Sequence, residues 1–329
     1  MNGPLGLDRP LVLSPMVDVT DAAFRSVAAG WGADVTCSEM VSAAGLVQGN
    51  DKSWRLVRPW PGESPYGVQV MGGEAEQVAE AVRLVADRVG PDFVDLNLGC
   101  PSPNILRACA GGFLLRDPVR AGRVVRAAVA AGEEAGVPVS VKMRVGPDAG
   151  HPTYLQVGAE AQAAGAAWCT LHGRTVEQGY RGEADWTAIA RLADALVVPV
   201  VGNGDLRGPG DVVRMADETG CAGFFIARAA MNDPTVFRRM RQALDGREVE
   251  PEPGLAVRLD SLRTYLHRAA EAGITHPAVL KRQVTRFVSG APGARAVRRR
   301  LQDARDADAL LAALDLLEVA PLHDGDGEA

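Results

Sequence analysis

The sequence predicts an α/β fold, a (β/α)8 TIM barrel followed by a small C-terminal helical domain, and three observations support this. Eight short β-rich runs recur between Leu11 and Ile226. Helix-forming segments separate several of these runs, and such alternation implies parallel strands. Eight units in about 240 residues match a barrel. An open doubly wound sheet is the runner-up, but it would carry a glycine-rich turn after its first strand, where this chain has Pro15-Met16-Val17.

The predicted elements follow from composition and spacing. Short runs rich in β-branched and aromatic residues indicate buried strands, here Leu11–Ser14, Asp34–Ser38, Tyr66–Val70, Phe93–Asn97, Val139–Val141, Cys169–His172, Val200–Gly202 and Gly223–Ile226. Longer segments rich in Ala, Val, Glu and Arg indicate helices between them, including Glu74–Val89, Val119–Ala135, Tyr154–Ala164 and Arg207–Glu218.

The last third of the chain has a different composition. Residues 246–254 are rich in Pro, Gly and Glu, which indicates a linker between a barrel over 1–245 and a helical domain over 255–322. Predicted helices there are Leu255–Ala272, Pro277–Ser289 and Ala294–Leu317. The acidic tail, residues 323–329, is expected to be disordered.

Composition and charge limit the possible environments and partners. The longest apolar runs are too short to cross a bilayer, and the first ten residues lack the pattern of a secretory signal. Five widely spaced cysteines without a CxxC pair, and five scattered histidines, favour a cytoplasmic protein with free thiols and no metal. We expect a monomer.

The net charge of −6 is unevenly distributed. Residues 255–300 hold ten Lys or Arg and two Asp or Glu, so this part carries +8 and the remainder −14. Either a polyanion binds the C-terminal part, or the arginines form a solvated helix face.

Polar side chains follow nearly every predicted strand. The run Phe-Val-Asp-Leu-Asn-Leu-Gly-Cys-Pro, residues 93–101, ends a buried strand in an amide and then presents the thiol of Cys100, although a free cysteine can also be an inert core residue. The strand ends of a barrel meet at one face, so these residues are expected to form one site. The residues at or just after the ends of the eight predicted strands, most of them polar, are Pro15, Met16, Glu39, Met40, Gln69, Asn97, Cys100, Lys142, Arg144, His172, Arg174, Asn203, Gly204, Asp205, Ala227 and Arg228.

The residue types at these strand ends narrow the chemistry. Paired carboxylates, a Ser-His-Asp set and a metal-ligand cluster are all missing from them. Amides at Gln69, Asn97 and Asn203, with cations at Lys142 and Arg228, suit the polar edge of a flavin. Gly202, Gly204 and the turn over residues 223–230 could let backbone N–H groups reach a terminal phosphate.

At these residues the sequence resembles the tRNA-dihydrouridine synthase family. The resemblance covers the barrel in order and is carried by Ser14-Pro15-Met16-Val17-Asp18-Val19-Thr20-Asp21 with Phe24-Arg25, Val68-Gln69-Val70, Asp95-Leu96-Asn97-Leu98-Gly99-Cys100-Pro101, Val141-Lys142-Met143-Arg144, Leu171-His172-Gly173-Arg174-Thr175 and Gly202-Asn203-Gly204-Asp205. It implies an FMN enzyme that reduces the C5–C6 double bond of uridine in tRNA, with NADPH as electron donor.

The resemblance also implies roles for individual residues. Cys100 would be the general acid. The residues that would bind FMN are Pro15, Met16, Val17, Gln69, Lys142, His172, Asn203, Gly204, Asp205, Ala227 and Arg228. The residues that would contact the tRNA are Asn97, Arg107, Arg144, Arg174, Arg282, Arg286, Arg298 and Arg299, with Arg295 and Arg300 as further candidates.

The chain departs from the family pattern at a few positions. Asn104 stands where the family usually has Lys or Arg, and Arg107 is a possible substitute. Ala227-Arg228-Ala229 replaces Gly-Arg-Gly, and Gln283 stands where a histidine is usual.

Two other functions are compatible with a barrel of this kind. One is an FMN reductase of a small molecule, similar to dihydroorotate or ene reductases, which would have no use for a basic helical domain. The other is an RNA-binding protein on a barrel without activity, which would not require Cys100, Lys142 and His172.

Overall fold

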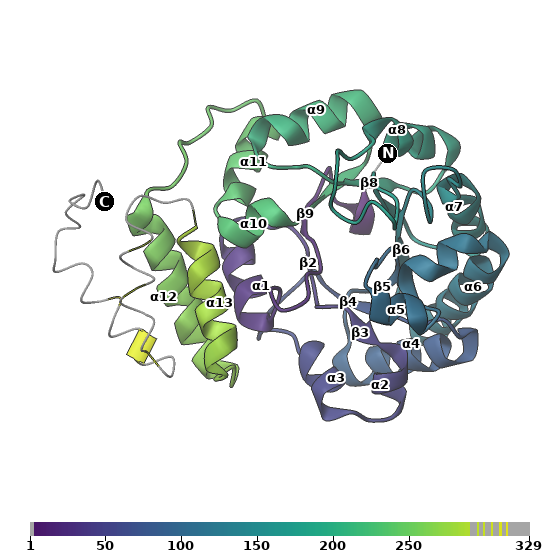
Figure 1. The fold of residues 1–329 in the computed structure, drawn as a ribbon, viewed down its shortest axis with the longest axis horizontal. Helices are drawn as coiled ribbons and strands as arrows, with labels where there is room; N and C mark the ends of the chain where they lie inside the picture. The colour runs from purple at the N-terminus through teal and green to yellow at the C-terminus, as the bar shows by residue number, and fades with distance from the viewer. Residues whose placement is uncertain are drawn as a thin grey trace.

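The computed structural model describes residues 3–289 together with residues 295, 299, 304, 309, 310 and 314. Eight parallel strands in this part of the chain form a barrel (Figure 1). The strands are β1 (Leu11–Leu13), β2 (Thr36–Cys37), β4 (Tyr66–Met71), β5 (Phe93–Leu98), β6 (Val139–Arg144), β7 (Cys169–His172), β8 (Val200–Asn203) and β9 (Gly223–Ile226). The predicted TIM barrel is confirmed.

The strand order β1-β9-β8-β7-β6-β5-β4-β2 excludes the open doubly wound sheet. A parallel bridge between Val12 and Val35, just before β2, joins the two ends of the sheet. The short strand β3 (Val41–Ser42) continues the pairing of β2 along β4. Strand β6 extends three residues beyond its predicted end, because Lys142 and Arg144 interrupt the apolar run that predicted it.

Helices surround the barrel (Figure 1). Those after the strands include α1 (Ala22–Gly30), α2 (Ala43–Val47), α3 (Asp51–Leu56), α4 (Ala75–Val89), α6 (Pro118–Ala135), α7 (Tyr154–Ala163), α8 (Trp186–Ala195), α9 (Pro209–Thr219) and α11 (Val236–Leu244). Short elements at the chain start or within loops are η1 (Pro4–Gly6), α5 (Pro103–Arg107), η2 (Gly111–Arg116) and α10 (Arg228–Asn232). Apolar faces of the longer helices pack on the strands, as in α4, whose buried residues recur at helical spacing.

Strand register places the polar strand ends beside one another. Asn97 of β5 pairs with Lys142 of β6. One row higher, Arg144 pairs with His172, His172 with Asn203, and Asn203 with Phe225. At the opposite end of the barrel, the rings of Phe93 and Trp168 meet edge to face with centroids 4.9 Å apart and fill the interior. The polar residues therefore gather at the C-terminal end of the strands.

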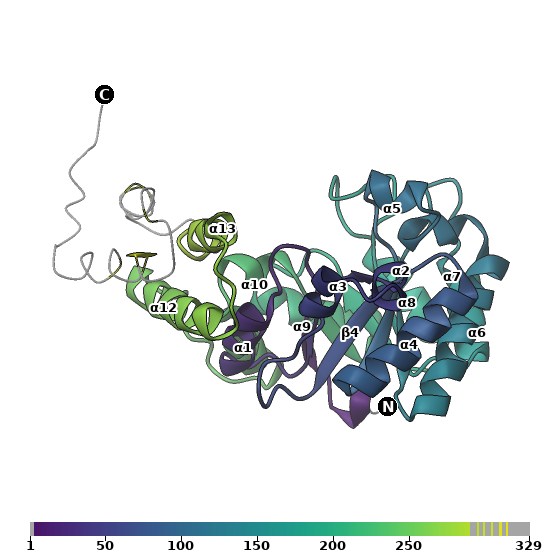
Figure 2. The same ribbon diagram turned by 90° about the horizontal axis from the view of Figure 1, so that it is seen from below.

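Two further helices, α12 (Leu255–Glu271) and α13 (Pro277–Phe287), lie side by side, with α12 packed against α1 and α13 against α10 (Figures 1 and 2). Phe24 and Phe287 pack with ring centroids 5.9 Å apart, and the Tyr265 hydroxyl donates to Asp21 at 2.9 Å. Gln283 is buried and donates to the Val19 carbonyl at 2.8 Å. The third predicted helix, 294–317, and the tail lie mainly outside the described residues.

Candidate active site

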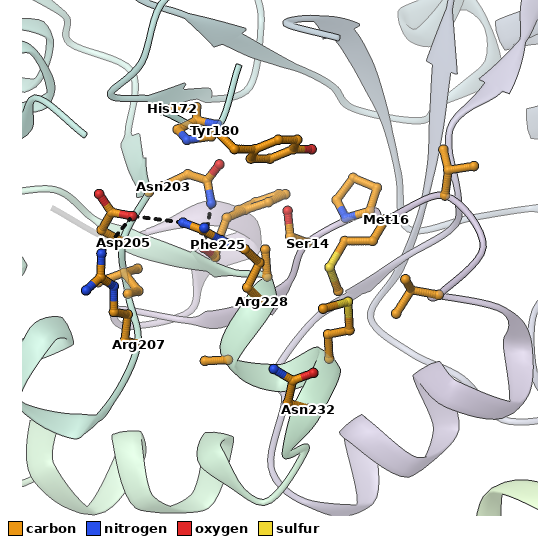
Figure 3. A pocket seen from close by; sticks show the side chains of 18 of the residues that line it. Ser14, Met16, His172, Tyr180, Asn203, Asp205, Arg207, Phe225, Arg228 and Asn232 are labelled. Carbon is orange, nitrogen blue, oxygen red and sulfur yellow. Dashed lines mark hydrogen bonds and ion pairs between the residues drawn. The ribbon is translucent and has the colours of Figure 1, made fainter. Parts of the chain in front are cut away.

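A cavity of about 820 Å³ lies at the C-terminal ends of the barrel strands. All eleven predicted cofactor residues line it, together with Asn97, Cys100, Arg144 and Arg286. Figure 3 shows His172 and Tyr180 in one part of the cavity wall, Ser14 and Met16 in another, and Arg228 beside Asp205. Side chains from distant parts of the sequence therefore share one hollow, as the alternation of strands and helices predicts.

The end of β5 aims Cys100 at this cavity. The Asn97 side-chain oxygen accepts hydrogen bonds from the backbone N–H groups of Gly99 and Cys100, both at 3.0 Å. Arg144 Nε donates to the Gly99 carbonyl at 2.8 Å. The turn that carries the thiol is thus fixed by side chains from two strands, and the thiol stays half-buried in the cavity wall.

The Lys142 side chain projects from β6 and contacts the Asn203 side chain at the end of β8. Its ammonium group donates to Asn203 Oδ1 at 3.0 Å, and Asn203 Nδ2 donates to the Phe225 carbonyl at 2.7 Å. Burial, and then the positive charge of Arg144, lower the pKa of Lys142 to about 8. A buried ammonium with a lowered pKa is stabilised by an anion, so this wall favours a negatively charged ligand.

The imidazole of His172 lies in the same positive environment. Burial lowers its pKa well below the usual value, and the charges of Lys142, Arg144, Arg174 and Arg228 lower it further. His172 is therefore neutral at neutral pH and can both donate and accept hydrogen bonds.

Asp205 organises the arginines beside the cavity. Its carboxylate accepts from Arg174 at 2.8 and 2.9 Å and from Arg228 at 2.9 Å, and Figure 3 shows the contact with Arg228. Burial raises the pKa of Asp205, but hydrogen bonds from the Ala184 N–H and from Arg174 outweigh it, so the pKa is lowered. Asp205 is therefore an anion that holds the Arg228 guanidinium at the cavity.

The structure does not bring Arg174 to the cavity surface. Only 1% of its surface is exposed, and its guanidinium donates to the carbonyls of Arg181 and Gly182 as well as to Asp205. The sequence predicted a substrate contact here because Arg174 follows His172 at the strand end. Its position instead ties the loop after β7 to Asp205.

The other predicted tRNA contacts lie in different surroundings. Arg107 is exposed on α5, hydrogen-bonded to Asn104, and outside the cavity lining. Arg286 of α13 reaches the cavity and donates to the Asp18 carbonyl at 2.6 Å, while Arg282, one turn earlier, lies 3.7 Å from the Asp18 carboxylate. Arg295 and Arg299 are exposed, and Arg298 and Arg300 lie outside the described residues.

Several cavity residues were not identified from the sequence. Phe225 lies two residues before Ala227, so inward alternation along β9 could have indicated it. Tyr180 comes from the loop after β7, 66% exposed, with its ring 5.7 Å from the Arg144 guanidinium and 5.9 Å from that of Arg228. Nothing in the sequence marks a loop residue of this kind. Among the described residues, no group of three or more His, Cys, Asp or Glu side chains could hold a metal ion.

Comparisons with known proteins agree with this geometry. The family model described as "Dihydrouridine synthase (Dus)" matches residues 12–321. A "Probable tRNA-dihydrouridine synthase" of Treponema pallidum is 37% identical over 299 residues, covering 89% of this chain and 87% of the relative. "tRNA-dihydrouridine synthase B" of Xanthomonas axonopodis pv. citri is 36% identical over 264 residues, covering 80% and 78%.

A solved 2-naphthoyl-CoA reductase complex shares the fold with a TM-score of 0.51 at 12% identity, covering 71% of this chain and 48% of that one. The parallel barrel, with amides, cations and a thiol around one cavity at its strand ends, defines a barrel enzyme. The chain belongs to the dihydrouridine synthase family.

None of the helices in the described parts of the chain has the length and apolar character needed to span a bilayer.

Proposed function

We propose that this protein is a flavin-dependent tRNA-dihydrouridine synthase, which uses FMN and NADPH to reduce the C5–C6 double bond of uridines in tRNA. The observation that carries the proposal is the convergence of Cys100, Asn97, Lys142 and His172 on one cavity, in a chain whose curated relatives bear that enzyme name.

The residues present fit an anionic flavin. The cavity is within the usual size range of cofactor sites, about 300–1,000 Å³. Lys142 uses one of its three N–H bonds on Asn203 within the described part of the chain, which leaves capacity for a ligand. Gln69, Lys142 and His172 would hold the ring system and its side chain. Asn203, Gly204, Ala227 and Arg228 would hold the phosphate end, with Asp205 orienting Arg228.

Reduction of the C5–C6 bond adds a hydride equivalent at C6 and a proton at C5. A reduced flavin, when bound, supplies the hydride. Cys100 supplies the proton, which breaks its S–H bond and leaves a thiolate. Lys142 and Arg144 line the same cavity as this thiol.

The substrate base must leave its stack to reach this cavity, because duplex or stacked bases cannot enter a hollow at the end of a barrel. Arg286 lies at the cavity on α13, and Arg282 and Arg299 are exposed on the helical part. These cations would bind tRNA phosphates on either side of the extruded uridine. The positive charge of residues 255–300 supports this arrangement.

The test is to map dihydrouridine by mass spectrometry in tRNA from cells that lack this gene. Loss of dihydrouridine at defined positions, restored by the intact gene and not by a Cys100→Ala version, is the expected result. An unchanged dihydrouridine map in a strain without related enzymes would contradict the proposal.

A further inference from the structure

A chain of buried polar side chains begins deep inside the barrel at Asp95. One carboxylate oxygen of Asp95 accepts from Ser140 Oγ at 2.7 Å, and the other accepts from Gln69 Nε2 at 2.6 Å. Asp95 and Ser140 are fully buried, and Gln69 is 1% exposed. The mechanism above assigns no role to this carboxylate, although burying it costs free energy.

The chain continues upward to the reactive cysteine. The side-chain oxygen of Gln69 accepts from Asn97 Nδ2 at 2.9 Å. The side-chain oxygen of Asn97 accepts from the backbone N–H of Cys100. Asp95, Gln69 and Asn97, on the neighbouring strands β5 and β4, thus link Ser140 of β6 in series to the thiol turn.

The two ends of this series fix the amides between them. An amide that turns by 180° keeps its shape and exchanges donor for acceptor. The Asp95 oxygen that faces Gln69 accepts a hydrogen bond, so it requires the nitrogen of Gln69, whereas backbone N–H groups only donate, so they require the oxygen of Asn97. Without Asp95, the side-chain nitrogen of Gln69 would lose its acceptor in the barrel interior, and the amide could rotate so that this nitrogen faces the cavity.

The hydrogen-bonded series also determines which donors and acceptors of Gln69 and Asn97 remain available to a ligand. Both side-chain oxygens already accept hydrogen bonds, and each NH2 group uses one of its two hydrogens within the series. One N–H on Gln69 and one on Asn97 remain, and both residues line the cavity. The free N–H groups therefore favour a ring edge that presents acceptors, such as carbonyl oxygens, although one lone pair of the Gln69 oxygen also remains.

We propose that Asp95 is a positioning residue that anchors Gln69, and through it Asn97, so that both amides present N–H donors to the carbonyl edge of a bound ring. This inference rests on the proposed function for the identity of the ring, a flavin. The hydrogen-bonded series itself does not depend on it.

Asp95 has a second effect through its charge. It is among the groups whose charge raises the pKa of Lys142, against the larger effect of burial. A substitution that removes the charge of residue 95 but keeps a hydrogen-bond acceptor therefore separates the positioning of Gln69 from the effect of charge on Lys142. Asp95→Asn can direct its oxygen to Gln69 and its nitrogen to Ser140 Oγ, whereas Asp95→Leu removes the acceptor at similar volume.

The experiment measures the dissociation constants of FMN, 2-thio-FMN and 4-thio-FMN for the full-length protein freed of flavin. Sulfur is a weaker acceptor than oxygen, so the wild type is expected to bind at least one thio-flavin about tenfold more weakly than FMN, which is the loss of one good hydrogen bond. Asp95→Leu is expected to reduce this ratio to about twofold, and Asp95→Asn to keep it within about threefold of the wild-type ratio. The inference would be overturned if Asp95→Leu kept the wild-type ratio of thio-flavin to FMN dissociation constants, or if Asp95→Asn lowered that ratio as much as Asp95→Leu does.

A second measurement needs no flavin and keeps the test valid if Asp95→Leu does not fold or the wild type binds no FMN. Exchange of the Gln69 side-chain hydrogen that is donated to residue 95, followed by NMR, is expected to be slow in the wild type and in Asp95→Asn, and at least tenfold faster in Asp95→Leu. Fast exchange in the wild type or in Asp95→Asn would overturn the role of Asp95. Failure of the wild type to bind FMN, with slow Gln69 exchange, would instead refute the proposed cofactor alone.

Discussion

At the scale of single residues, the site depends on how each side chain is held. Cys100 is one of five free thiols, and Cys37, Cys169 and Cys221 are buried. Burial raises the pKa of those three thiols, which keeps them protonated and inert. Cys100 differs because its turn is fixed by Asn97 and its side chain reaches the cavity.

Cys100→Ala is therefore expected to keep FMN affinity and to lower the rate of uridine reduction about 10²- to 10⁴-fold, the usual contribution of a general acid. Single-turnover rates of dihydrouridine formation measure this. Cys109→Ala, at a half-buried thiol outside the cavity lining, is the matched control and should retain full activity. Equal rates for Cys100→Ala and the wild type would disprove the role as proton donor.

The pKa of Lys142 gives a pH-dependent prediction. A flavin ring whose acceptors take a hydrogen bond from Lys142 stabilises the ammonium form, so binding takes up a proton between about pH 8, where the free protein loses it, and the higher pKa of the complex. FMN affinity should be constant between about pH 7 and 8, above the second pKa of its phosphate, and fall by up to about tenfold per pH unit above pH 8. Isothermal titration at several pH values measures this. Lys142→Met should bind more weakly throughout and lack this dependence, and an unchanged slope in that variant would contradict the assignment.

At the scale of elements, the end of β8 needs a glycine. Gly204 has φ of +118°, and a Cβ there would lie 2.7 Å from Ala184 Cβ and 3.0 Å from His172 Cδ2. The close approach of β8 to His172 is what brings Asn203 and the imidazole to one wall.

Gly204→Ala is expected to lower the free energy of unfolding by about 1–3 kcal/mol, because the backbone is strained and His172 must move. FMN affinity should fall in parallel. Chemical denaturation and flavin titration measure the two effects. Gly210→Ala, at an open position in α9, should be neutral or stabilising by up to about 1 kcal/mol, and a similar loss there would show that the Gly204 effect is not local.

At the scale of the whole molecule, the helical part is packed on the barrel rather than merely linked to it. Tyr265, Gln283 and Phe287 contact Asp21, Val19 and Phe24. Deletion of residues 246–329 would therefore expose apolar surface on α1, so charge reversal is the better test of tRNA binding.

Arg282→Glu combined with Arg299→Glu is expected to weaken tRNA binding and to reduce the salt dependence of the association constant, since each lost phosphate contact lowers the slope by about 0.7–0.9. Filter binding at several salt concentrations measures this, with FMN affinity unchanged. Arg123→Glu combined with Arg191→Glu, at exposed positions on α6 and α8 of the barrel, changes the net charge by the same amount and is the control. Equal effects of the control and the double variant would mean that only net charge matters.

Much of the fold could be predicted from the sequence because parallel barrel strands are short, apolar and regularly spaced. The strands Cys169–His172 and Gly223–Ile226 have the predicted limits. Strand β6 continues beyond its predicted end, because Lys142 and Arg144 interrupt the apolar run from which the strand was predicted. The site could be predicted where residues directly follow strands. Arg174 could not, because its burial depends on the loop after β7 and on Asp205, and Tyr180 could not, because its position depends on loop conformation.

The most direct test of the account is anaerobic single turnover of the FMN-loaded, pre-reduced protein. Unmodified tRNA should reoxidise the flavin and yield one dihydrouridine, detected as the added mass of two hydrogens, for each flavin oxidised. Free uridine and dihydroorotate-type substrates should leave the flavin reduced on the same timescale. Reoxidation that does not depend on tRNA, or tRNA that leaves the reduced flavin unchanged, would contradict the account.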